Sequence, residues 1–131
     1  MSLPSRSLVD TVLAALCAAT VVFLAVRDLF VPEIRDVEVW LGFELHGRAA
    51  QLTAPLHWGI FALAAWAFWR SKAWIWSAAA AYVFYVALSH LVWSEASPHG
   101  RGWPMGLLQA AGISLVGAWM LRRSRRRHPR S

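Results

Sequence analysis

Four long apolar stretches constrain the fold of this chain more than any other feature of its sequence. They cover residues 8–26, 53–69, 73–93 and 104–121, and apart from Asp10 none of them contains an aspartate, glutamate, lysine or arginine. Each is close to the roughly 20 residues that an α-helix needs to cross about 30 Å of hydrocarbon. Helices that are apolar on every face must be surrounded by lipid or by one another. The sequence therefore predicts four transmembrane helices.

The composition excludes a water-soluble domain of this size. Only 15% of the 131 residues are charged and 58% are hydrophobic, whereas about a quarter of the residues in a typical soluble domain are charged. A small domain has a large surface for its volume, and so few charged side chains cannot cover it. A disulfide scaffold is excluded as well, because Cys17 is the single cysteine. We therefore expect an all-α integral membrane protein, a four-helix bundle that forms one domain over residues 1–131.

The basic residues predict how the helices cross the membrane, because cytoplasmic loops carry the excess of lysine and arginine. Nine of the 13 basic residues precede the first stretch, lie between the second and third, or follow the fourth. The two remaining connections hold four basic residues and six of the seven acidic ones. The sequence thus predicts that both termini are cytoplasmic. The strong preference for arginine over lysine, together with the many alanines, favours a bacterial cytoplasmic membrane.

Tryptophans lie near the predicted helix ends, where an amphipathic ring is most stable at headgroup depth. Eight of the nine tryptophans are explained in this way. Those expected at the inner ends are Trp69, Trp74, Trp76 and Trp119, and those expected at the outer ends are Trp40, Trp58, Trp93 and Trp103. The aromatic richness therefore indicates anchoring in the membrane rather than a ligand cage.

A basic tail, residues 122–131, follows the fourth stretch directly. A run of arginines can bind nucleic acid, but the positive-inside rule already explains it at this position. We expect anionic lipid headgroups as the partner, at roughly 1 kcal/mol per basic residue near the surface, and no nucleic acid. The residues expected to bind headgroups are Arg122, Arg123, Arg125, Arg126, Arg127 and Arg130.

The outer connection, residues 27–52, is too rich in apolar residues to be a plain loop. Its apolar residues recur at helical spacing, as on an amphipathic helix that lies in the headgroup plane. From Val37 to His46 they also alternate strictly with other residues, which is the period of a β-strand. A lone strand at membrane depth would leave its backbone groups unpaired. We therefore expect a short interfacial helix that begins near Pro32 and ends around Gly47, with a strand as the alternative.

Three polar residues lie at a similar shallow depth near the outer ends of three predicted helices: His57, His90 and Gln109. Polar residues inside a bilayer tend to face the other helices and to mark a site or a pathway. The outer connections add further polar groups, and those included in the candidate site are Glu44, His46, Glu95 and His99, with Glu38 close by. The competing interpretation is that each histidine is simply wet or hydrogen-bonded near the membrane surface.

Three chemistries fit this candidate site. Imidazole and carboxylate suit zinc or copper, with His46, His57, His90 and His99 as ligands and a glutamate nearby. A haem held by His57 and His90 is a second possibility, and a proton relay through histidine and glutamate is the third. No zinc signature, nucleophile elbow or phosphate-binding loop is present in the sequence. The sequence thus fixes neither a cofactor nor a reaction.

Close packing of helices in lipid relies on small residues at four-residue spacing. The fourth stretch carries one such ridge, formed by Gly106, Ala110, Ser114 and Ala118. It is expected either to pack within the bundle or to dock a second copy or another membrane protein. The sequence favours a non-catalytic membrane protein that packs against a partner or itself. The alternative is an outer-face site for binding, transport or catalysis.

Overall fold

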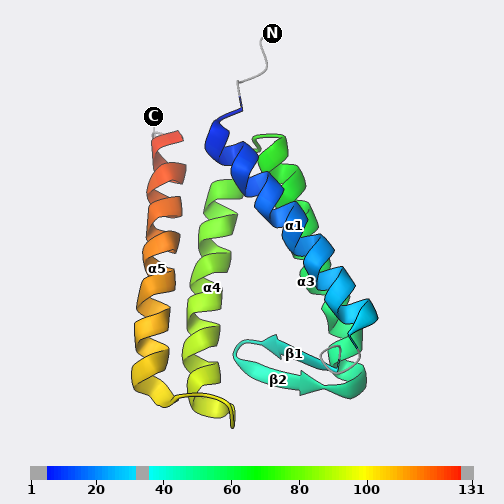
Figure 1. Ribbon diagram of the computed structural model, residues 1–131. Helices are drawn as coiled ribbons and strands as arrows, with labels where there is room; N and C mark the ends of the chain where they lie inside the picture. The colour runs from blue at the N-terminus through cyan, green and yellow to red at the C-terminus, as the bar shows by residue number, and fades with distance from the viewer. Residues whose placement is uncertain (1–5, 32–35, 128–131) are drawn as a thin grey trace. The chain divides into compact units, whose positions relative to one another are not determined.

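A computed structural model describes residues 6–31 and 36–127 of the chain. Its four long helices are α1 (Leu8–Phe30), α3 (Gly47–Trp69), α4 (Ile75–Ala96) and α5 (Gly102–Arg127) (Figure 1). All four are long enough and apolar enough to cross a membrane. The chain is therefore an all-α, multi-pass membrane protein, as the sequence predicts.

The helix ends extend beyond the predicted apolar stretches. Helix α1 continues to Phe30, and α3 begins at Gly47 and contains Pro55 in its first turns. An apolar pattern marks only the part of a helix that lies in hydrocarbon, whereas the backbone hydrogen bonds continue into the headgroup region. At its start, α1 is capped by Ser7, whose side chain accepts a hydrogen bond from the backbone N–H of Asp10.

The outer connection forms a β-hairpin, and the interfacial helix expected there is wrong over residues 37–46. Strand β1 (Val37–Trp40) pairs with β2 (Phe43–His46). Leu41 and Gly42 form the turn, with φ of 53° and 85°, as a tight two-residue hairpin requires. Because the two strands pair with each other, the objection that a lone strand leaves its backbone unpaired does not apply. Pro32, where the helix was expected to begin, lies outside the described residues.

The chain is divided into two compact units. The first contains α1, α3 and the base of the hairpin, including Glu38 and His46. Helix α1 packs along α3 (Figure 1), and four of the residues buried in these two helices are alanines: Ala14, Ala50, Ala54 and Ala67. Small side chains let two helices approach closely, which is the main source of attraction between helices in lipid.

The second unit contains the hairpin tip, residues 39–45, together with α4 and α5. A Cβ atom on Gly106 would lie 2.8 Å from Ser94 Cβ, and one on Gly117 would lie 3.1 Å from the Phe84 ring. Both glycines thus allow α5 to pack closely on α4. The buried residues of α5 are Gly106, Gly117, Met120 and Ser124. Of the predicted ridge, Gly106 is buried and Ala110, Ser114 and Ala118 are half-buried, and its docking of a partner stays a prediction.

The hairpin tip packs closely on α4. A Cβ atom on Gly42 would lie 2.5 Å from Val92 Cβ and 2.6 Å from the carbonyl oxygen of Ser89. The backbone N–H of Leu41 donates to the Tyr85 hydroxyl at 3.0 Å. Glycine at position 42 therefore serves both the turn and the contact.

Candidate functional site

Charged and polar side chains lie together in the first unit, near the end of α1, the first strand of the hairpin and the first half of α3. Arg27 and Asp28 are in the last turn of α1, Glu38 is in β1, and His57 and Trp58 are neighbours in α3. We call these five residues the Glu38 cluster. It is the candidate site that the structure defines most fully.

Glu38 is at the centre of the cluster and is only 5% exposed. Its Oε1 accepts a hydrogen bond from an Arg27 terminal nitrogen at 2.6 Å, and its Oε2 lies 2.7 Å from His57 Nδ1. A buried carboxylate is costly unless it is paired and hydrogen-bonded. Both of its oxygens meet that requirement.

Asp28 is buried to a similar degree and completes the network. Its Oδ1 accepts from Arg27 Nε at 2.5 Å, and its Oδ2 accepts from the Trp58 indole N–H at 2.8 Å. All four carboxylate oxygens of Asp28 and Glu38 therefore have a donor or an imidazole nitrogen beside them. Two carboxylates face one guanidinium, so the cluster carries a formal charge of minus one that a proton on His57 would neutralise.

Part of this cluster could be found from the sequence. His57 is the predicted site residue that meets a carboxylate, and Glu38 was expected near it. Arg27, Asp28 and Trp58 were not expected as members, since Trp58 was assigned to an aromatic belt. The available signal was the Arg27–Asp28 pair at the end of an apolar stretch, where a charge must find a partner or water.

Glu44, a second hairpin carboxylate, belongs to the other unit. Its Oε1 accepts from the Trp93 indole N–H at 2.8 Å and from the Ser97 hydroxyl at 2.7 Å. Like Trp58, Trp93 was expected only as a membrane anchor. In both cases the indole N–H donates to a carboxylate of the protein itself.

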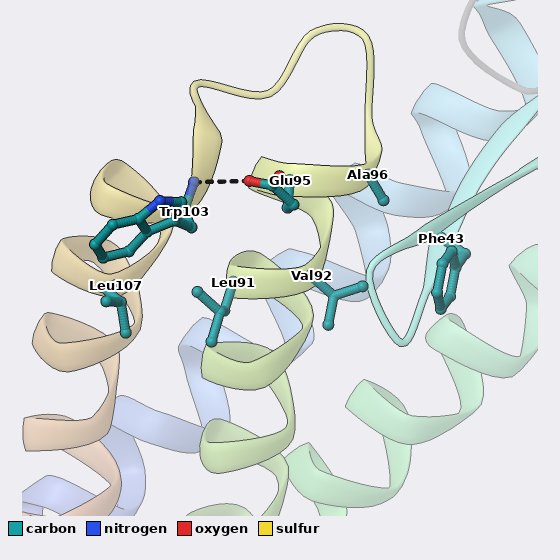
Figure 2. Close-up of a pocket in the computed structure, with 7 residues that line it drawn as sticks. All are labelled: Phe43, Leu91, Val92, Glu95, Ala96, Trp103 and Leu107. Carbon is teal, nitrogen blue, oxygen red and sulfur yellow. Dashed lines mark hydrogen bonds between the residues drawn. The ribbon is translucent and has the colours of Figure 1, made fainter.

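Glu95 lies at the rim of an apolar hollow of about 520 Å³ in the second unit. Figure 2 shows this hollow beside the last turns of α4 and the first turns of α5. Apart from Glu95, the lining residues are Phe43, Leu91, Val92, Ala96, Trp103 and Leu107. Glu95 Oε2 accepts from the backbone N–H of Trp103 at 3.0 Å. This carboxylate thus joins the two helices at their connection.

The remaining predicted site residues are exposed: His46, His90, His99 and Gln109. His46 belongs to the first unit with His57, whereas His90 and His99 belong to the second. Within residues 6–31 and 36–127 no group of three or more histidine, cysteine or acidic side chains is arranged to hold a metal ion. The convergence of the four histidines on a metal or a haem stays a prediction.

Two tail arginines contact a tryptophan. The guanidinium carbons of Arg123 and Arg127 lie 4.8 Å and 5.2 Å from the centre of a Trp76 ring. Trp76 is fully buried and packs edge-to-face on Trp119 at 5.6 Å, so its expected place in a lipid-facing belt is wrong. The other described tail arginines, Arg122, Arg125 and Arg126, are exposed. Arg130 lies outside the described part of the chain.

No family model matches the chain, and neither a curated protein nor a solved structure is significantly similar to it. Its function must therefore be argued from these residues alone.

Proposed function

We propose that this protein is a non-catalytic membrane protein that acts by packing against a membrane partner or a second copy of itself. One observation carries the proposal: every carboxylate oxygen of the Glu38 cluster already has a partner within the chain. A catalytic base or a metal ligand needs a lone pair directed at the reacting group or the ion. In the Glu38 cluster each of the four carboxylate oxygens makes a contact within the protein, and these contacts join α1, β1 and α3.

The proposed location is a bacterial cytoplasmic membrane with both termini in the cytoplasm. The support is the distribution of basic residues, nine on the predicted inner side against four on the outer. The exposed arginines of the tail, Arg122, Arg125 and Arg126, are then placed to meet anionic headgroups.

A partner is proposed to pack on the face of α5 that α4 leaves open. The space beside Gly106 is filled by Ser94, so the small ridge that begins at Gly106 is not the best docking face. Leu108 and Leu115 are 66% and 74% exposed, and a Cβ atom on Gly112 would meet nothing within 4 Å. Residues 108, 112 and 115 follow the heptad spacing of a helix–helix seam.

The first experiment compares two histidines that differ in their surroundings. His57 contacts Glu38, whereas His90 is exposed. If the cluster is structural, His57→Ala lowers the stability in mild detergent by about 1–3 kcal/mol because it leaves a buried carboxylate oxygen unsatisfied, and His90→Ala leaves the stability unchanged. The purified protein is expected to be colourless and to contain no stoichiometric metal. A bound metal or haem that either substitution removes would overturn the proposal.

A second experiment tests self-association. Leu115→Cys in a Cys17→Ser background is expected to give a disulfide-linked dimer in native membranes after mild oxidation. Leu63→Cys in α3, where the side chain is 53% exposed, is the control and is expected to stay monomeric. A monomer for both variants contradicts packing of two copies through α5 and leaves a different membrane protein as the partner.

A proton relay is the second candidate function, and the contact between Glu38 and His57 favours it. Histidine is the side chain most suited to passing a proton near neutral pH, and His57 Nδ1 lies 2.7 Å from Glu38 Oε2. Proton flux into proteoliposomes tests it. A relay requires flux that His57→Gln abolishes, because glutamine can keep the hydrogen bond to Glu38 but cannot carry the proton.

A further inference from the structure

The hollow between α4 and α5 combines apolar walls with one carboxylate. Its side chains are apolar except for Glu95, and two of them, Trp103 and Leu107, are 60% and 47% exposed. Figure 2 shows Trp103 and Leu107 on successive turns of α5, opposite Leu91 on α4. In a membrane protein, a surface of this kind faces lipid chains.

Glu95 is the feature that distinguishes this hollow from an ordinary lipid-facing surface. Its Oε2 accepts from the backbone N–H of Trp103, and within residues 6–31 and 36–127 its Oε1 has no hydrogen-bond donor. The carboxylate is thus held in place by one oxygen while the other stays open. Glu44 differs, because one of its oxygens accepts two hydrogen bonds from α4 side chains and the residue lies farther inside the unit.

The residues around Glu95 suit a cation with a donor group. An open carboxylate oxygen attracts an ammonium group and accepts its hydrogen bond. Trp103, whose backbone N–H holds the other carboxylate oxygen, has a side chain that is 60% exposed. Arg101 is exposed in the same connection, two residues before Trp103, and supplies a positive charge for a phosphate.

We propose that this hollow is a binding site for a phospholipid with a primary amine, phosphatidylethanolamine. One acyl chain lies against Leu91 and Leu107, and the ammonium group donates a hydrogen bond to Glu95 Oε1. Arg101 faces the lipid phosphate. The chemistry selects a primary ammonium over a quaternary one, because a choline headgroup has no N–H to donate.

Native mass spectrometry of the purified full chain in mild detergent tests this proposal. Phosphatidylethanolamine, phosphatidylcholine and phosphatidylglycerol with identical acyl chains are added separately. We expect one phosphatidylethanolamine per chain to bind at least tenfold more tightly than phosphatidylcholine, whereas phosphatidylglycerol also binds the tail arginines. Equal binding of the three lipids, or equal binding of the ethanolamine and choline lipids, overturns the proposal.

Two pairs of variants separate the headgroup from the chain. Glu95→Gln can still accept from the Trp103 N–H but has no charge, so it is expected to lose the preference for the ethanolamine lipid. Glu95→Lys is expected to reverse it in favour of phosphatidylglycerol. Leu107→Trp fills the hollow and is expected to lower binding about tenfold, whereas Leu63→Trp, at an exposed position of α3 that does not line the hollow, leaves it unchanged. If Glu95→Gln binds the ethanolamine lipid as the unchanged protein does, the carboxylate has no role and the proposal fails.

Discussion

A carboxylate buried among membrane helices is costly, because taking it out of water is repaid only by close pairing and hydrogen bonds. Glu38 meets this condition through Arg27 and His57, and Asp28 meets it through Arg27 and Trp58. Arg27 is therefore shared by both carboxylates. Loss of one member leaves the others in place but unpaired, so the network is expected to be sensitive to single substitutions.

Removal of the Glu38 side chain is expected to lower the free energy of unfolding by about 3–5 kcal/mol, the range for breaking a buried ion pair. Glu38→Gln keeps one acceptor and is expected to cost less. Unfolding by SDS titration in mixed micelles measures both. The control is Glu95→Gln at an exposed carboxylate, which is expected to leave the stability unchanged. Equal stability of Glu38→Ala and the unchanged protein would show that the ion pairs contribute nothing.

The cluster also shows what can be predicted at the scale of a residue. The depth of His57 was available from its position in an apolar stretch. Its partner was not, because the direction in which a helix presents a side chain depends on how that helix packs. Trp58 was assigned to the membrane surface for the same reason, since an indole that donates to Asp28 has the same sequence position as one that anchors in lipid.

Among the elements, the hairpin is where prediction failed and the helices are where it succeeded. Four helices follow from length and hydropathy alone, because hydrocarbon allows few other backbone structures. Residues 37–46 show both the helical and the strand period. The positive φ at Leu41 and Gly42 decides between them, since it permits a two-residue turn and lets the strands pair. Leu-Gly is a weaker turn signal than Asn-Gly or Asp-Gly.

Two glycines of the hairpin region allow steric contact to be separated from backbone strain. Gly42 and Gly47 both have positive φ, but a Cβ atom meets α4 only at Gly42 and nothing within 4 Å at Gly47. Gly47→Ala is therefore expected to cost about 1–2 kcal/mol for the backbone alone. Gly42→Ala is expected to cost more, because Val92 and the Ser89 carbonyl must also move. Thermal unfolding of the two variants gives the comparison, and equal losses would contradict close packing of the tip on α4.

For the whole molecule, the predicted orientation in the membrane depends on how the arginines are distributed among the connections and the tail. The structure divides the tail arginines into two groups that the sequence could not separate. Arg123 and Arg127 lie over Trp76, although Arg127 is itself exposed, whereas the exposed Arg122, Arg125 and Arg126 contact no tryptophan ring within the described residues. A count of basic residues treats these side chains alike. The contact with Trp76 is a result of how the second unit packs, which the count does not contain.

The two groups are expected to have different effects when they are replaced by glutamine. Substitution of Arg122, Arg125 and Arg126 is expected to weaken binding of phosphatidylglycerol by roughly 1 kcal/mol per arginine, with no change in stability. Substitution of Arg123 and Arg127 is expected to lower the melting temperature through loss of the cation–π contacts. Lipid retention in native mass spectrometry and thermal unfolding measure the two effects. Equal changes in lipid retention and in melting temperature for both groups would contradict the division of the arginines into lipid-binding and Trp76-contacting groups.

The hairpin also sets an order of events during synthesis. Glu38 finds Arg27 11 residues before it and His57 19 residues after it, so the base of the hairpin can close once α3 has emerged. The tip packs later, because Leu41 is hydrogen-bonded to Tyr85, 44 residues later, and Glu44 is hydrogen-bonded to Ser97, 53 residues later. At about 5–20 residues per second this delay lasts several seconds. The nascent chain thus completes the hairpin from base to tip, and the unpaired Leu41 N–H stays open to water or the insertion machinery until α4 arrives.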